Sequence, residues 1–131
     1  MITISEIHDR ILSGESTARA EVEAAFERAE QASGYHALLS LTKERAYERA
    51  DEIDLRIKNG EDAGPLAGVP FVVKDNYLAF GAPTTAASRI LEDFMAPLQA
   101  TVVEKLERAG AICIGKSNLD AFAHGGSTEN S

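Results

Sequence analysis

Two short apolar runs constrain the fold of this chain more than any other feature. Residues 69–73 read Val-Pro-Phe-Val-Val and residues 111–114 read Ala-Ile-Cys-Ile. Such runs suit strands covered on both faces, as in a parallel sheet, so we expect strands near 69–74 and 111–115. Between them, Thr101 has the spacing of a capping box with the glutamate three residues later, ahead of an apolar helix face. A strand, a long connection with a helix and a second strand predict a βαβ-like unit.

The region that precedes these runs has the periodicity of helices. Thr3 and Glu6 have capping-box spacing ahead of a first helix, which Gly14 ends. The further expected elements are a second helix from Ser16-Thr17, a short extended stretch over 35–41 and a third helix over 43–58 with Thr42 as its cap. The apolar positions expected to face the core are Ile4, Ile7, Ile11, Leu12, Val22, Phe26, Ala29, Ala46, Ala50, Ile53, Ile57, Val102, Val103, Leu106 and Ala109.

Charge and cysteine content exclude several classes of protein. Thirteen basic and 21 acidic residues give a net charge of −8 and a pI near 4.8. This balance argues against a surface for the nucleic-acid backbone, because such a surface is basic. The single Cys113 excludes a disulfide framework and a multi-thiolate metal site. No apolar run reaches the roughly 20 residues of a membrane span, and Met1 leads directly into a polar pattern. We therefore expect a cytoplasmic protein without membrane contact.

The composition divides the chain near Gly64. All four prolines follow that residue, whereas most of the acidic excess precedes it. Residues 1–64 are therefore expected to form a helical lead, and residues 65–131 a segment of strands and turns. The fold class predicted from these patterns is α/β, with the amino-terminal helices packed on a small, mostly parallel or mixed sheet.

Lys74 is the candidate for chemistry, because it stands at the carboxyl end of the first expected strand. In open α/β sheets this edge is where ligands and catalytic groups gather. A lysine that extends from an apolar, water-excluded strand surface is desolvated. Desolvation lowers the pKa of the amine and favours its neutral form, which can act as a base. The alternative is a lysine that surfaces where the strand ends and pairs with Asp75. Spacing alone favours this alternative, because many strands end in Lys-Asp.

No other complete catalytic set is visible in the sequence. His8, His36 and His124 are scattered, and no two of them have metal-ligand spacing. Neither a Gly-x-Gly-x-x-Gly pattern nor a phosphate-binding loop occurs. Cys113 lies inside the second expected strand and is interpreted as a small buried hydrophobic residue.

Residues 64–76, Gly-Pro-Leu-Ala-Gly-Val-Pro-Phe-Val-Val-Lys-Asp-Asn, strongly resemble the lysine-bearing segment of the amidase-signature family. The likeness continues through Gly81, Thr84-Thr85 and Ser88, through residues 114–120 and into Gly-Gly-Ser-Thr-Glu-Asn-Ser at residues 125–131. It covers essentially the whole chain. The resemblance implies a part of an α/β/α fold.

The resemblance also implies a Ser–cis-Ser–Lys triad for amide hydrolysis. The lysine matches Lys74, stays neutral and takes a proton relayed through a serine in a cis peptide linkage. A second serine attacks the amide carbon, which gives an acyl-enzyme and free ammonia, while backbone amides stabilise the oxyanion. Lys116 is interpreted as structural, because the family's catalytic lysine matches only the Lys-Asp-Asn segment.

The chain departs from the family pattern at two points. The family's two catalytic serines lie downstream of anything present here, so residues 1–131 are similar to the amino-terminal portion of such a domain, and this portion alone is predicted to be inactive. His124 stands where methionine is common, either beside the substrate pocket or simply at a helix end. The resemblance favours Gly126, Ser127 and Thr128 as a substrate-binding pocket wall, and the alternative is a turn in which the hydroxyls bind their own backbone.

Within the family, the chain is most similar to the glutaminase subunits of tRNA-dependent amidotransferases. That likeness implies release of ammonia from glutamine for the ATP-dependent conversion of Glu-tRNA(Gln) to Gln-tRNA(Gln). ATP and Mg would be used by a partner subunit, the partners would be subunits B and C, and tRNA would be met only through the complex. No cofactor or metal is expected in this chain. The alternatives are part of a stand-alone amidase for another small amide, or a non-catalytic binding and assembly domain.

Overall fold

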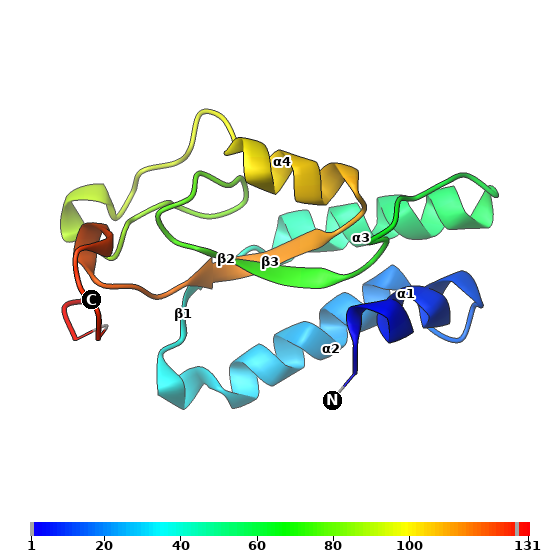
Figure 1. Cartoon of the computed structure of the whole chain (residues 1–131), viewed down its shortest axis with the longest axis horizontal. Coiled ribbons are helices and arrows are strands. Elements are labelled where there is room, and N and C mark those ends of the chain that lie inside the picture. The colour runs from blue at the N-terminus through cyan, green and yellow to red at the C-terminus, as the bar shows by residue number, and fades with distance from the viewer. Residues whose placement is uncertain (1, 128) are drawn as a thin grey trace.

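A small mixed sheet with helices on both faces forms the centre of the structure (Figure 1). The computed structural model describes residues 2–127 and 129–131. The elements are α1 (Ile4–Leu12), α2 (Ala18–Gln31), the 3-10 turn η1 (Ser33–Tyr35), β1 (Leu38–Leu41), α3 (Lys43–Lys58), β2 (Pro70–Lys74), η2 (Arg89–Leu91), α4 (Thr101–Arg108), β3 (Ile112–Ser117) and η3 (Ala121–Ala123). None of the described helices is both long and apolar enough to cross a membrane.

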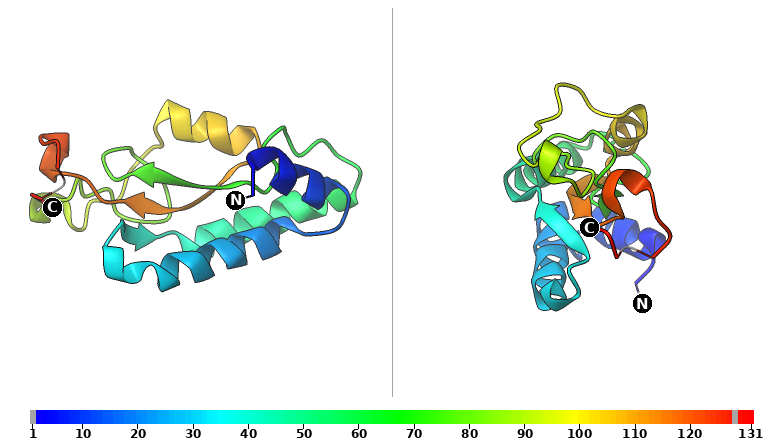
Figure 2. Two further views of the ribbon diagram at one scale, coloured as in Figure 1. Left: turned by 60° about the horizontal axis from the view of Figure 1, so that its bottom comes forward. Right: turned by 90° about the vertical axis from the view of Figure 1, so that its left-hand side faces the viewer.

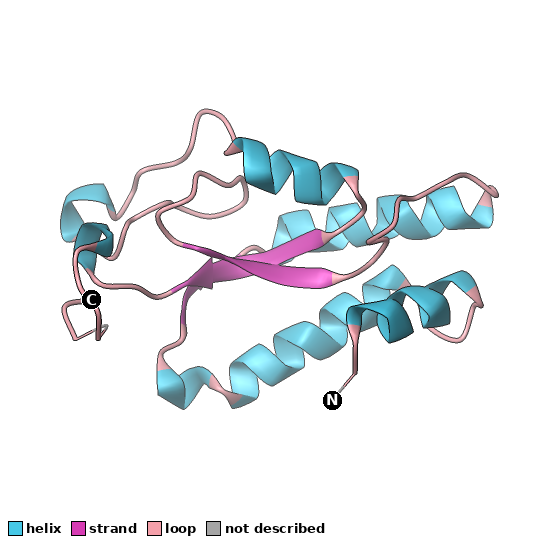
Figure 3. Ribbon diagram, in the orientation of Figure 1, coloured by secondary structure: helices cyan, strands magenta, loops and turns pink. Residues whose placement is uncertain are grey.

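The sheet has the strand order β1-β3-β2 (Figure 3). β3 is parallel to β2 and antiparallel to β1, so β2, α4 and β3 form the expected βαβ unit within a mixed sheet. Central β3 is buried along nearly its whole length, as its apolar run predicts. β2 is an edge strand among the described residues, and its Val72 is 47% exposed. The expectation that both faces of this strand are covered is therefore wrong here.

The helices form two layers around the sheet. α2 and α3 pack on one face against Ile112 and Ile114, whereas α4 packs on the other face, where Val103 meets Val73 and Cys113. Two orientations show the sheet between these layers (Figure 2). Most of the expected core positions are buried, but Ile4, Leu12 and Val102 are exposed. In these helices the other expected positions Ile7, Ile11 and Val103 are buried.

Two glycines allow the starts of β2 and β3 to come together. Gly64 and Gly110 both have φ of +94°, a left-handed conformation that favours glycine. A Cβ on Gly64 would collide with the main chain of Ala109, and one on Gly110 with the carbonyl of Ala63. Two hydrogen bonds join these main-chain segments, one from the Leu66 amide to the Ala109 carbonyl and one from the Gly68 amide to the Gly110 carbonyl. The loop before β2 is thereby fixed to the turn before β3.

The three expected helix caps have different outcomes. Thr3 caps α1 with a complete capping box, in which its amide and hydroxyl donate to Glu6 and lower the pKa of that carboxyl. Thr42 holds the N-cap position of α3, but its hydroxyl donates to the Cys113 carbonyl at 2.8 Å instead of capping. The capping box at Thr101 is wrong, because α4 begins at Thr101 and Ala100 is its N-cap.

We predict that Thr3→Ala lowers the free energy of unfolding by about 1 kcal/mol, because the orphan amide at Glu6 loses its acceptor. Thr101→Ala is the matched control, since an exposed threonine without a capping bond should change stability by less than about 0.5 kcal/mol. Urea unfolding followed by circular dichroism measures both. Equal effects of the two substitutions would contradict this assignment.

Candidate functional site

Lys74 is the last residue of β2 and lies at the carboxyl edge of the two parallel strands, where its sequence position predicts it. It is aligned with Ser117 of β3, and its carbonyl accepts a hydrogen bond from the Tyr77 amide at 2.9 Å. The described residues leave its side chain exposed. They therefore do not supply the dry surroundings that would favour a neutral amine. Its assignment as the catalytic base stays a prediction.

The neighbouring carboxylate, Asp75, does not pair with Lys74. It is fully buried and accepts a hydrogen bond at 2.7 Å from Nζ of Lys116, which is also 0% exposed. Lys116 lies within β3 and does not follow it. Its Nζ also donates to Oγ1 of Thr84 at 3.0 Å. A buried charge is costly unless it is paired and hydrogen-bonded, so each member of this pair depends on the other.

The second oxygen of Asp75 binds the loop that follows. Oδ2 accepts from the Thr85 amide at 2.9 Å and from the Thr85 hydroxyl at 2.5 Å. The Asp75 carbonyl accepts from the Ala86 amide at 3.0 Å, and its own amide donates to the Ser117 carbonyl at 3.1 Å. Asp75 thus joins the end of β2, the end of β3 and the Thr84–Ala86 loop. Below, "the Asp75 cluster" denotes Asp75, Thr84, Thr85 and Lys116.

Left-handed backbone conformations mark the loops beside this cluster. Ala86 and Ala87 have φ of 48° and 53°, and Phe122 and Ala123 have φ of 53° and 60°. Residues with a Cβ adopt this region only when their surroundings fix them. The Phe122 amide donates to the Ala86 carbonyl at 2.8 Å, which joins the two strained segments. The segments around η2 and η3 lie next to each other beyond the carboxyl ends of β2 and β3, as the views in Figures 1 and 2 show.

Two of the expected substrate-binding residues, Gly126 and Ser127, follow η3 in a loop. Gly126 and Ser127 are exposed, and the Ser127 hydroxyl donates to Oε2 of Glu129 at 3.0 Å, within its own loop. Thr128 lies outside the described residues. His124 is exposed at the C-terminal end of η3, as the helix-end alternative expects. A substrate role for Gly126, Ser127 and Thr128 stays a prediction.

Ser88 and Cys113 have structural surroundings. The Ser88 hydroxyl accepts from the Ile90 amide and caps η2. Cys113 is buried, and burial raises the pKa of its thiol, which opposes formation of a reactive thiolate. The burial of Cys113 agrees with its interpretation from the sequence as a small buried hydrophobic residue.

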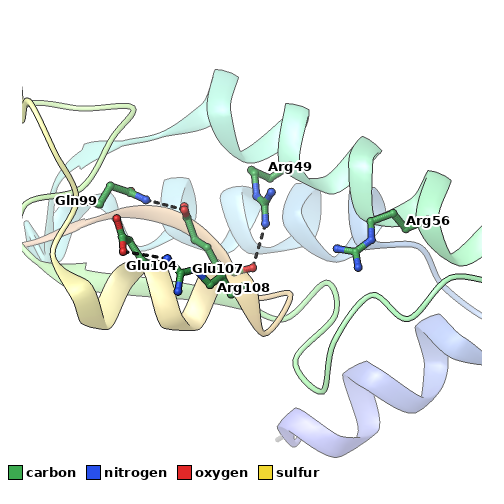
Figure 4. Close-up of a pocket in the computed structure, with 6 residues that line it drawn as sticks. All are labelled: Arg49, Arg56, Gln99, Glu104, Glu107 and Arg108. Carbon is green, nitrogen blue, oxygen red and sulfur yellow. Dashed lines mark hydrogen bonds and ion pairs between the residues drawn. The ribbon is translucent and has the colours of Figure 1, made fainter.

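A groove of about 370 Å³ lies between α3 and α4 (Figure 4). The residues that line it do not include Lys74 or its neighbours in β2. Its three arginines are already engaged: Arg49 donates to the Glu107 carbonyl at 3.0 Å, Arg56 lies 3.9 Å from Glu61, and Arg108 lies 3.4 Å from Glu104. Gln99 donates to Oε2 of Glu107 at 2.7 Å. The Arg49 contact joins α3 to α4, and the pairing of these arginines leaves no excess of unpaired positive charge for an anion among the lining residues.

The sequence interpretation missed the Asp75 cluster, although a signal for it was present. Lys116 comes shortly after the apolar, buried run Ile112–Ile114 in the same strand. A lysine in such surroundings needs a buried carboxylate as a partner for its amine. Side chains alternate along a strand, and Asp75 lies on the same face as buried Val73, which is aligned with Lys116. Combining the two patterns would have paired Asp75 with Lys116.

Comparison with known proteins places the chain in a family. A family model described as Amidase matches residues 20–131. The A subunit of the glutamyl-tRNA(Gln) amidotransferase of Gloeobacter violaceus is 48% identical over 132 aligned residues, which cover 100% of this chain and 27% of that protein. Its counterpart in Nostoc punctiforme is 46% identical, with the same coverage.

Solved structures agree with the fold expected from the resemblance. A chain of a vestigial protein complex that reveals the evolutionary origins of an s-triazine catabolic enzyme has a TM-score of 0.93 and 38% identity, over 98% of this chain and 29% of that one. The peptide amidase of Stenotrophomonas maltophilia has a TM-score of 0.87 and 30% identity, over 92% and 25%. The glutamyl-tRNA(Gln) amidotransferase A subunit from Thermotoga maritima has a TM-score of 0.74 and 32% identity, over 99% and 25%. The chain therefore belongs to the amidase family and spans 27% of the length of the curated relatives named above.

Proposed function

We propose that this chain is the lysine-bearing, amino-terminal part of the glutaminase subunit of a glutamyl-tRNA(Gln) amidotransferase. In this proposal Lys74 is the base that receives the proton relayed from the attacking serine. The observation that carries it is the place of Lys74 at the carboxyl edge of parallel β2 and β3. The support for the substrate is 46–48% identity, over the whole chain, to the A subunits of two such amidotransferases.

The chemistry needs one lysine that is free to exchange a proton. Lys116 is held by Asp75 and Thr84 in the interior, so its amine cannot reach a substrate. The Lys74 side chain is exposed and has no hydrogen-bond or ion-pair partner among the described residues. It is therefore the lysine of this strand pair that can meet a serine brought to the sheet edge.

The proposed partners follow from the same assignment. Glutamine would be the amide substrate, and the released ammonia would pass to partner subunits B and C. ATP and Mg would be used by a partner subunit, and Glu-tRNA(Gln) would be met only through the complex. The acidic balance of this chain, with a net charge of −8, agrees with a protein that does not itself hold the tRNA backbone.

A stand-alone amidase for another small amide is the second candidate. It is favoured by the TM-scores of 0.93 and 0.87 to the s-triazine-related complex and the peptide amidase, against 0.74 to the Thermotoga maritima amidotransferase protein. The two candidates share the lysine chemistry and differ in the amide. A panel of glutamine, asparagine and a peptide amide, assayed for ammonia release with and without subunits B and C, separates them.

We predict that residues 1–131 alone release no ammonia from glutamine above background. A lysine can accept a proton, but the family's nucleophile and relay serines are absent, and loss of triad members costs on the order of 10⁴-fold or more in turnover. The measurement compares this chain with a full-length enzyme that carries it. Robust release by residues 1–131 would make a residue such as Ser127 the nucleophile and would overturn the assignment. Inactivity of both proteins towards every amide would instead favour the non-catalytic binding and assembly domain.

A further inference from the structure

We propose that the Asp75 cluster is a positioning device for catalysis, which holds Lys74 and the Gly125–Ser127 loop in a fixed relation. Asp75 and Lys116 are the positioning residues. The inference rests on the proposed function for the role of Lys74, and its geometry stands on contacts that no other part of the site uses. Asp75, Thr84 and Lys116 are buried, and their mutual contacts lie among the described residues.

The two lysines lie on opposite faces of the sheet. Val73 and Asp75 alternate with Val72 and Lys74 along the end of β2, and only the first two are buried. Val73 is aligned with Lys116, so the buried amine lies on the same face as Asp75. The Asp75 side chain is bonded to Lys116 at 2.7 Å and to Thr85. These contacts anchor the backbone next to Lys74 from the buried face of the sheet, while the Lys74 side chain lies on the exposed face.

Asp75 also connects this strand end to the expected substrate loop. Its side chain and carbonyl bind Thr85 and Ala86, and the Ala86 carbonyl binds the amide of Phe122. Phe122 lies in η3, three residues before Gly125. Two pairs of left-handed residues, Ala86-Ala87 and Phe122-Ala123, are held along this path. Strained backbone of this kind persists where surrounding contacts over-determine it. The Asp75 cluster contacts the first pair directly, through the Asp75 carbonyl and the Thr85 hydroxyl, and the second pair through the Ala86 carbonyl.

Loss of the pair should therefore reduce turnover by more than its effect on folding explains. A misplacement of about 1 Å at a catalytic group can cost on the order of 10²-fold in rate. The informative variant is the double substitution Asp75→Asn with Lys116→Met, which removes both charges and keeps the side-chain volumes similar. Removing one partner of a buried pair leaves an uncompensated buried charge, which is strongly destabilising, whereas the double substitution leaves no charge behind. The double variant thus separates positioning from folding.

The experiment measures kcat, KM and the melting temperature of the full-length enzyme and its variants, with whichever amide the enzyme hydrolyses. We expect the double variant to melt within a few degrees of wild type and to have a kcat about 10²-fold lower. The control, Arg108→Met, breaks the exposed pair with Glu104 and should leave kcat and melting temperature unchanged. A double variant with both the kcat and the melting temperature of wild type would overturn the proposal, because catalysis would then not need the pair.

A second measurement does not depend on activity and so separates failure of this proposal from failure of the proposed function. In residues 1–131, hydrogen exchange of the Ala86 and Phe122 amides reports the path from Asp75 to the loop. Each amide should exchange about tenfold faster or more in the double variant than in wild type or Arg108→Met. Unchanged exchange in the double variant would overturn the positioning role, whatever amide the enzyme uses.

Discussion

Replacing Lys74 with alanine is expected to abolish ammonia release from glutamine by a full-length enzyme that carries this chain. The loss should be on the order of 10⁴-fold in kcat, because a triad without its base cannot activate the nucleophile. The fold should be intact, since the Lys74 side chain is exposed and its strand is held by backbone bonds to β3. The prediction is therefore a loss of turnover at nearly constant melting temperature.

The matched control is Lys105→Ala, which removes another exposed lysine, on α4. It should retain full activity and stability. Ammonia release is measured with a coupled glutamate dehydrogenase assay, and the melting temperature by differential scanning fluorimetry. Full activity of the Lys74→Ala enzyme would remove the central claim for this residue. A reduced activity that follows a reduced melting temperature would show a structural role instead.

The elements of the fold could be predicted where local chemistry decides them. The first capping box depends only on Thr3 and Glu6, and it forms as expected. The apolar run before Lys74 predicted a strand within one residue of its observed start, because β-branched side chains favour extended backbone. α3 occupies the expected residues 43–58 for a similar reason: Ala46, Ala50 and Ile53 repeat at helical spacing and are buried.

Features decided by distant contacts could not be read in the same way. The residue before Thr101 is fixed by its amide, which donates to the Leu78 carbonyl at 2.8 Å, so the helix starts one residue earlier than the capping pattern indicates. The Thr42 hydroxyl is taken by the Cys113 carbonyl, 71 residues away. The position of Lys74 followed from its strand, whereas the partner of Asp75 required the register between β2 and β3.

The interpretation of Lys116 shows the same limit most clearly. The sequence predicts a structural lysine but does not identify its partner. In the structure the amine is 0% exposed and bonded to Asp75 and Thr84. Removing it would leave the Asp75 carboxylate buried without its positive partner. We therefore expect loss of the Lys116 amine to be strongly destabilising.

We predict that Lys116→Ala lowers the free energy of unfolding by about 3–5 kcal/mol, the range for removing one partner of a buried ion pair. Because whole domains are stable by only about 5–15 kcal/mol, this change alone can consume much of the stability of residues 1–131. Urea unfolding, followed by circular dichroism, measures it through the shift of the midpoint at constant slope.

Lys43→Ala is the matched control for this prediction. Lys43 forms an ion pair of similar length with Glu30, 2.5 Å against 2.7 Å, but its side chain is 46% exposed. Water screens that pair and solvates either partner when the other is lost, so its removal should change the midpoint little. If Lys116→Ala shifted the midpoint no more than Lys43→Ala, Asp75 would have to reach water or another donor after the loss of the amine. The buried pair would then neither stabilise the strand end nor hold Asp75 in place, and both the stability argument and the positioning role would fail together.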